Sequence, residues 1–162
     1  CKQILSEFVG NDYIAYKIRY DGIFYEKGCS AISHHLKWQT DNQWIFDKIQ
    51  IYFINETNIK IKKELDKIYI HKYIKGQQFG KHADTYYKTQ IHNVGVCLNN
   101  DYDGGEFVLY NPEEQLPKEI GNIYTFPSQR MHEVKEILEG ERWSIIGFLH
   151  IDNLDFPKKS LI

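Results

Sequence analysis

The hydrophobic positions along the chain follow two patterns, one helical and one extended. Between Asp41 and Asn55, apolar residues recur every three or four positions, as in an amphipathic helix, and Thr40 or Asp41 can cap its first turn. We expect this helix to cover the outer face of a sheet. A short helical stretch is predicted to follow at about Asn58 to Asp66.

Most of the remaining chain alternates between short apolar runs and turn-forming residues, which is typical of strands. Near the start, Tyr13–Tyr20 and Ile23–Tyr25 flank Asp21-Gly22, a dipeptide that readily forms a two-residue hairpin turn. Further strands are predicted at Ile68–Lys75, Gln90–Leu98, Glu106–Leu109, Gly121–Phe126, His132–Ile137 and Arg142–Ile151. This series indicates a mainly β fold with flanking helices, and the architecture that fits best is a double-stranded β-helix, or jelly roll.

Composition indicates one enzyme-sized domain over residues 1–162, with its core at about 68–151. The net charge of −2 provides no general attraction to nucleic acid or to an anionic membrane, and no apolar run is long enough to span a bilayer. Cys1, Cys29 and Cys97 are widely spaced and form no C-x-x-C pair, which predicts a reducing compartment, the cytoplasm. The oligomeric state is not determined by the sequence.

The candidate chemistry lies in His82-Ala83-Asp84 and, far downstream, His132. Two imidazoles and one carboxylate can hold one Fe(II) on a single face of an octahedron and leave three positions open. A single residue between the first two ligands, at the end of a strand, lets both side chains turn toward a common point. Taken singly, His132 would more often be a hydrogen-bonded core histidine, and Arg142 a solvated surface charge.

The motifs around these residues favour the metal site because they occur in a fixed order. They are Tyr73–Asp84, Asp103–Phe107, Phe126–Ser128, His132–Val134 and Gly140–Ser144. Over roughly Ile68 to Ile151 they resemble the prolyl 4-hydroxylase-like branch of the Fe(II)/2-oxoglutarate-dependent dioxygenases. The resemblance implies that His82, Asp84 and His132 ligate Fe(II), that 2-oxoglutarate and dioxygen are cosubstrates, and that ascorbate is a further candidate.

The resemblance also implies a binding site for the distal carboxylate of 2-oxoglutarate, centred on Arg142. A guanidinium can donate two parallel hydrogen bonds to a carboxylate. Ser144, two residues along the strand, faces the same side and could add a hydroxyl, and Tyr73 occupies a position where the family often has a tyrosine near the cosubstrate. Collagen-type prolyl hydroxylases usually have Lys at the position of Arg142. Cys97 departs from the pattern, because relatives often carry another cosubstrate-binding tyrosine there.

The reaction implied is hydroxylation of a C–H bond coupled to decarboxylation of 2-oxoglutarate to succinate. Related halogenases replace the carboxylate with a small residue, so Asp84 favours hydroxylation. The resemblance favours a peptidyl proline bound across the barrel mouth, where the Lys81–Gln90 loop and the strand carrying His92 would together form one wall. The histidines His34, His35, His71 and His150 are interpreted as structural or surface residues, and His92 is the exception, expected to border the substrate cleft because it lies on the strand after the H-x-D loop.

Other functions remain open at this point. The substrate could be a peptidyl lysine, a free amino acid or another small molecule. Demethylation of nucleic acid ranks lower, because relatives with that activity carry a second arginine at the place of Phe148. A non-catalytic jelly-roll module with a structural metal would need a fourth protein ligand.

Overall fold

The computed structural model describes residues 15–16, 31–35, 43–61, 68–84 and 88–156 of the chain. In chain order its elements are β1 (Ala15–Tyr16), β2 (Ala31–His35), α2 (Gln43–Thr57), β3 (Lys60–Ile61), β4 (Ile68–Ile74), β5 (Phe79–His82), β6 (Gln90–Cys97), β7 (Asp103–Gly104), β8 (Phe107–Leu109), β9 (Glu114–Gln115), β10 (Ile123–Pro127), β11 (His132–Val134), β12 (Ile137–Glu139), β13 (Glu141–His150), the 3₁₀ turn η2 (Ile151–Asn153) and β14 (Leu154–Asp155).

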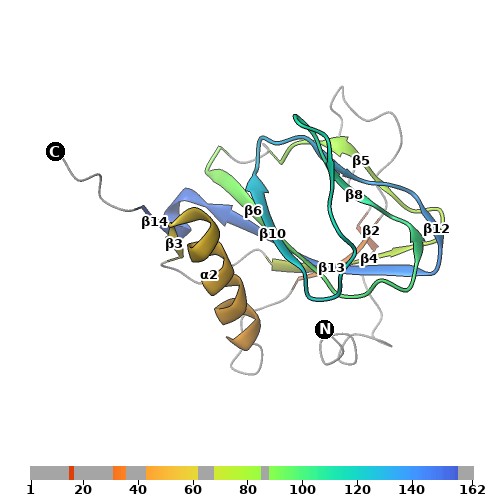
Figure 1. Cartoon of the computed structure of the whole chain (residues 1–162), viewed down its shortest axis with the longest axis horizontal. Helices are drawn as coiled ribbons and strands as arrows, with labels where there is room; N and C mark the ends of the chain where they lie inside the picture. Colours follow the sequence, from red (N-terminus) through yellow and green to blue (C-terminus); the bar gives the residue numbers. More distant parts are fainter. Residues whose placement is uncertain (1–14, 17–30, 36–42, 62–67, 85–87, 157–162) are drawn as a thin grey trace.

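Two antiparallel sheets form the body of the fold (Figure 1). The larger sheet has the order β1-β2-β4-β13-β6-β10, and the smaller sheet has the order β5-β11-β8-β9. Two short pairs, β12 with β7 and β14 with β3, complete the pairing. This arrangement of two sheets around a shared core is the predicted double-stranded β-helix, so the fold prediction is confirmed.

The core between the two sheets is rich in aromatic side chains. It contains Tyr73, Phe79, Tyr102, Phe107, Leu109, Leu116, Tyr124, Phe126, Val134 and Ile137, all of them buried. Phe107 lies at the centre, with ring centroids 5.0 Å from Tyr124 and 5.7 Å from Phe126. The strands of the larger sheet therefore present one face to the smaller sheet and the other face outward, as alternating strand residues must.

The outward face of the larger sheet is covered by α2. Ile45, Phe46, Ile49 and Phe53 are buried on one stripe of the helix, which packs on Ile70, Val94, Val96, Ile145 and other residues of β4, β6 and β13. The predicted helix and its covering role are thus confirmed, while its expected caps lie outside the described residues. In the described part of the chain no helix combines the length and the apolar character needed to cross a membrane.

The predicted strands agree with the structure except where the chain changes sheets. The predicted strand His132–Ile137 is interrupted: β11 ends at Val134 and pairs with β5 and β8, whereas β12 begins at Ile137 and pairs with β7. The helix expected at Asn58–Asp66 is wrong for Lys60–Ile61, which form β3 and pair with β14. The rest of the predicted stretch, residues 62–66, lies outside the described residues.

The N-terminal hairpin prediction is mostly untested. Ala15–Tyr16 form β1 and pair with Ala31–Ile32 of β2. Asp21-Gly22 and Ile23–Tyr25 lie outside the described residues. The H-x-D spacing suited the end of a strand, as found for β5, but the range Phe79–His82 was not predicted, because Gly80 and Lys81 interrupt any alternation of apolar and polar residues.

Candidate metal centre and the neighbouring arginine

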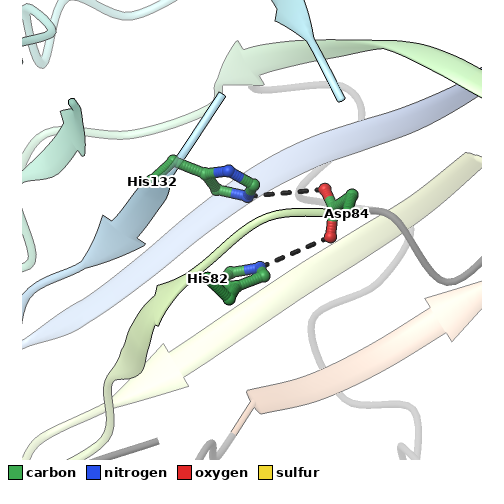
Figure 2. Close-up of side chains that lie close together, drawn as sticks. All are labelled: His82, Asp84 and His132. Carbon is green, nitrogen blue, oxygen red and sulfur yellow. Dashed lines mark ion pairs between the residues drawn. The ribbon is translucent and has the colours of Figure 1, made fainter. Parts of the chain in front are cut away.

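Three segments bring His82, Asp84 and His132 together (Figure 2). His82 is the last residue of β5 and lies directly opposite His132, the first residue of β11. Asp84 follows β5, and its backbone N–H donates a hydrogen bond of 2.9 Å to the carbonyl of Ser128, just after β10. One potential ligand atom from each of the three side chains lies within 4.8 Å of the others.

The side-chain geometry suits a single bound cation. The Asp84 carboxylate lies between the imidazoles, with Oδ1 3.4 Å from Nε2 of His82 and Oδ2 3.4 Å from Nε2 of His132. The other ring nitrogen, Nδ1, lies 2.7 Å from the carbonyl of Gly80 in His82 and 3.0 Å from the carbonyl of Arg130 in His132. A carbonyl only accepts, so each Nδ1 carries a proton, and each Nε2 faces the Asp84 carboxylate, the orientation in which Nε2 of a metal-binding histidine meets the ion.

The electrostatics of the cluster favour the protonation states of metal ligands. Burial by itself raises the pKa of the Asp84 carboxyl, but hydrogen bonding and charge interactions with His132 and His82 outweigh it, so the pKa lies below its ordinary value. Burial also lowers the pKa of His82, although Asp84 opposes this shift. An ionised carboxylate beside a neutral imidazole is the donor set that Fe(II) accepts.

Arg142 lies on the inner face of β13, opposite Tyr73 of β4. Its side chain is 4% exposed, and Nη1 donates a hydrogen bond of 2.7 Å to the hydroxyl of Ser144. The guanidinium carbon lies 5.6 Å from the centroid of the Tyr73 ring, and the buried Nε has no hydrogen-bond partner. The three side chains that were predicted to bind the cosubstrate therefore do lie together.

The charge of Arg142 is unbalanced within the described part of the chain. None of the ion pairs in the described residues includes Arg142. The groups whose charge interactions affect its pKa most are tyrosines and Cys97. Burying a charge without a counter-charge is costly. A buried guanidinium whose Nε–H has no hydrogen-bond partner is therefore suited to binding the carboxylate of a ligand.

Two tyrosines that the sequence analysis missed also reach Arg142. The positive charge of Arg142 acts on the hydroxyls of Tyr102 and Tyr124 and by itself lowers their pKa, although burial acts more strongly. Burial raises the pKa of both hydroxyls, so each keeps its proton and can donate it to a carboxylate. The thiol of Cys97 donates a hydrogen bond of 3.1 Å to the carbonyl of Asn99.

Gly95 makes room for Tyr124. The two residues are opposite each other on β6 and β10, and a Cβ on Gly95 would lie 2.2 Å from the Tyr124 ring. The glycine within a strand was a visible signal of a close approach, but its partner depends on strand register. The ring of Tyr124 can therefore lie directly over Gly95 of β6.

Substituting Gly95 with Ala is expected to destabilise the protein by about 1–3 kcal/mol, the usual cost of overpacking a core. Thermal or urea unfolding measures this loss. The cost should shrink in a Tyr124→Leu background, because the clashing ring is then gone. Equal costs in both backgrounds would show that the clash with Tyr124 is not the cause.

His71 lies on the same inner face, opposite Ser144, and was interpreted from the sequence as a structural or surface residue. Burial and then the charge of Arg142 lower the pKa of His71 from 6.5 to about 4, so its imidazole is neutral at pH 7. It is thus a partly buried, neutral hydrogen-bonding group beside the predicted cosubstrate residues.

Lowering the pH from 6.5 toward 4 is expected to destabilise the metal-free protein through His71. The unfolded chain binds a proton near the ordinary pKa of 6.5, whereas the folded chain resists it until about 4. The unfolded state therefore binds more protons than the folded state across this window. A difference of one bound proton lowers the free energy of unfolding by up to about 1.4 kcal/mol for each unit by which the pH falls.

Urea unfolding of the wild type and His71→Asn at several pH values measures this contribution. The slope of unfolding free energy against pH should become shallower in the variant without vanishing, since burial also lowers the pKa of His82 and His92. The Asp84 carboxyl titrates below its ordinary 3.8, outside this window. An unchanged slope in His71→Asn would contradict the assignment.

The remaining sequence predictions concern His92, the substrate loop and Phe148. His92 does not border the inner face: its ring packs edge-on against Phe53 of α2, with centroids 5.4 Å apart, so that prediction is wrong. The predicted substrate loop cannot be assessed over Thr85–Tyr87, which lie outside the described residues. Phe148 packs against Tyr69, with ring centroids 5.8 Å apart.

Comparison with known proteins agrees with this geometry. A family model described as the 2OG-Fe(II) oxygenase superfamily matches residues 68–150, a range that contains all of the predicted site residues. A PKHD-type hydroxylase of Prochlorococcus marinus is 30% identical over 96 residues, which are 55% of this chain and 43% of that relative. The chain thus matches less than half the length of this relative.

Solved structures share the fold at low sequence identity. An oxidoreductase of the 2OG-Fe(II) oxygenase family from Burkholderia pseudomallei has a TM-score of 0.73 and 16% identity, covering 94% of this chain and 79% of that one. A prolyl hydroxylase in complex with a hypoxia inducible factor peptide fragment from Trichoplax adhaerens has a TM-score of 0.72 and 15% identity, covering 93% and 76%. These likenesses support the jelly-roll architecture.

Proposed function

We propose that this chain, which belongs to the 2OG-Fe(II) oxygenase superfamily, is an Fe(II)- and 2-oxoglutarate-dependent hydroxylase. The observation that carries this proposal is the pairing of two features on the inner faces of the barrel. One is a cluster of two histidines and an aspartate with inward-facing Nε2 atoms, and the other is a buried arginine without a carboxylate partner in the described residues.

His82, Asp84 and His132 would hold the iron. Their donor types suit Fe(II), and three protein ligands leave positions for other molecules. When bound, the iron would supply the oxidative chemistry that couples decarboxylation of 2-oxoglutarate to succinate with hydroxylation of a C–H bond. The backbone carbonyls of Gly80 and Arg130 would keep each imidazole in the ligating tautomer throughout.

Arg142 would fix the far end of 2-oxoglutarate. Its guanidinium would bind the distal carboxylate, while the hydroxyls of Ser144, Tyr102 and Tyr124 add donors around the same group. Tyr73 would close one side of the guanidinium by stacking at 5.6 Å. These contacts orient the cosubstrate and exclude water from its charged end.

We propose a peptidyl proline as the substrate. This proposal draws on the names of the relatives: the curated ones are PKHD-type hydroxylases, and one solved neighbour is a prolyl hydroxylase with a bound peptide. A peptidyl lysine, a free amino acid or another small molecule is the second candidate class. Phe148, packed on Tyr69 where nucleic-acid demethylases of this superfamily carry an arginine, disfavours nucleic acid.

A substrate screen tests both parts of the proposal. The protein would be loaded with Fe(II) and 2-oxoglutarate under anaerobic conditions, mixed with proline-containing peptides, free proline, free lysine or methylated oligonucleotides, and then exposed to oxygen with and without ascorbate. We expect succinate formation and a mass gain of one oxygen on a peptide, located on proline by fragmentation, and neither with Asp84→Ala. Oxygen gained by a small molecule or oligonucleotide alone would refute the peptidyl substrate and leave the reaction class intact.

A further inference from the structure

Asn93 lies on the inner face of β6 and contacts the predicted iron ligand Asp84. Its side chain is completely buried, with 0% exposure, and Nδ2 donates a hydrogen bond of 2.6 Å to Oδ2 of Asp84. No motif in the sequence pointed to this residue, which belongs to a different sheet from the histidine ligands. The contact therefore links the larger sheet to the predicted metal centre.

The orientation of the Asn93 amide is fixed by its other contacts. Its Oδ1 accepts two hydrogen bonds, one of 3.0 Å from Nε2 of Gln90 and one of 3.1 Å from the hydroxyl of Ser128. An ionised carboxylate only accepts hydrogen bonds, so the amide nitrogen must face Asp84, and the two donors on Oδ1 agree with this orientation. Ser128 also accepts the backbone N–H of Asp84, which ties the loop after β5 to the same network.

We infer that Asn93 is a positioning residue that holds Asp84 as a ligand through one oxygen. This inference rests on the proposed function. A carboxylate that bound iron through both oxygens would occupy two positions and leave too few for a chelating 2-oxo acid and dioxygen. The hydrogen bond from Asn93 engages Oδ2, so Oδ1 is the oxygen free to coordinate.

The chemistry of asparagine suits this role. Its amide is neutral, so it donates to Oδ2 without cancelling the negative charge that Asp84 offers the cation. The bond is short, as hydrogen bonds to carboxylates are, and it lies in a buried setting where it restricts rotation of the carboxylate. A lysine or arginine there would bind the carboxylate more strongly but would compete with the metal for it.

Calorimetric titration with Mn²⁺, which replaces Fe(II) without oxidising, tests the inference directly. Asn93→Ala should weaken Mn²⁺ binding by about 10- to 100-fold, the usual effect of removing a partner of a metal ligand. The matched control is Thr125→Val, which removes a hydrogen bond of 2.8 Å to the backbone carbonyl of Asn93 but leaves the contact with Asp84. Its Mn²⁺ affinity should equal that of the wild type.

A double-substitution cycle separates positioning from folding. In an Asp84→Ala background, Asn93→Ala should cause no further loss of Mn²⁺ affinity, because its target is gone. If Asn93→Ala does not fold, the double variant Gln90→Met/Ser128→Ala replaces it, since it frees the amide to turn while keeping Asn93. An affinity between those of Asp84→Ala and the wild type is expected there.

The outcomes distinguish this inference from the proposed function. Mn²⁺ affinity that falls in Asp84→Ala but is unchanged in Asn93→Ala, or in the Gln90→Met/Ser128→Ala variant, would overturn the role of Asn93 and leave the metal site intact. A wild-type protein that binds no Mn²⁺ would overturn the metal site and this inference together.

Discussion

Replacing His82, Asp84 or His132 with Ala is expected to abolish metal-dependent succinate formation while the domain stays folded. Each side chain would supply one of only three protein ligands, and two remaining ligands bind Fe(II) weakly. The fold should survive, although the His82 and His132 rings contact Phe79 and Phe126 of the aromatic core at 4.0 and 4.8 Å, because the other core contacts and the packing of α2 are unchanged. Metal analysis after gel filtration, circular dichroism and a succinate assay measure the three properties.

The matched control for these substitutions is His92→Gln. His92 is a histidine of the same domain that packs on Phe53 outside the barrel, so its replacement should leave iron content and succinate formation unchanged. Iron binding and succinate formation that persist in any two of the three Ala variants would show that the ligand assignment is wrong.

Arg142→Ala is expected to raise the requirement for 2-oxoglutarate strongly and to spare metal affinity. The substitution removes a charge-assisted pair from a desolvated site, which typically costs on the order of 2–5 kcal/mol, or at least tenfold in affinity. No predicted metal ligand is changed. Calorimetric titration of 2-oxoglutarate into Mn²⁺-loaded protein measures the affinity without turnover.

Two further variants make the Arg142 experiment specific. Arg142→Lys keeps the charge but loses the planar fork, so an intermediate affinity is expected. Lys75→Ala removes an exposed cation that pairs with Glu139 at 2.8 Å on the surface, and it should have no effect. Unchanged 2-oxoglutarate binding in Arg142→Ala would refute its assigned role.

The sequence predicted those parts of the fold that depend on local pattern. The helix was recognised because Ile45, Ile49 and Phe53 recur at helical spacing, and β4 and β13 because they are long and apolar. The short strand β5 could not be recognised, since Gly80 and Lys81 interrupt its pattern and its pairing with β11 is a long-range contact. Local propensity carries no information on such pairing.

The residues of the candidate site were likewise predictable from the sequence only in part. The residue types and order of His82, Asp84, His132 and Arg142 were visible in the sequence, and the structure brings the first three together, although their role as ligands remains a prediction. Tyr124 and Asn93 could not be found, because their contacts depend on which residues face each other across strands.

The error at His92 has a simple geometric reason. Alternate residues of a strand face opposite sides, and Cys97 was already expected to face the cosubstrate. Counting back in steps of two from Cys97 places Gly95 and Asn93 on the inner face and His92 on the outer one, as found. The prediction failed because it considered the strand as a whole instead of its two faces.

Anaerobic titration of the protein with Fe(II) and 2-oxoglutarate, followed by visible absorption, tests the central claim most directly. A 2-oxo acid that chelates protein-bound Fe(II) produces a charge-transfer band that neither component gives alone. We predict that the band appears and saturates at one equivalent of each in the wild type, is absent in Asp84→Ala, and needs at least tenfold more 2-oxoglutarate in Arg142→Ala. Wild-type protein that binds Fe(II) but develops no band with saturating 2-oxoglutarate would contradict the claim.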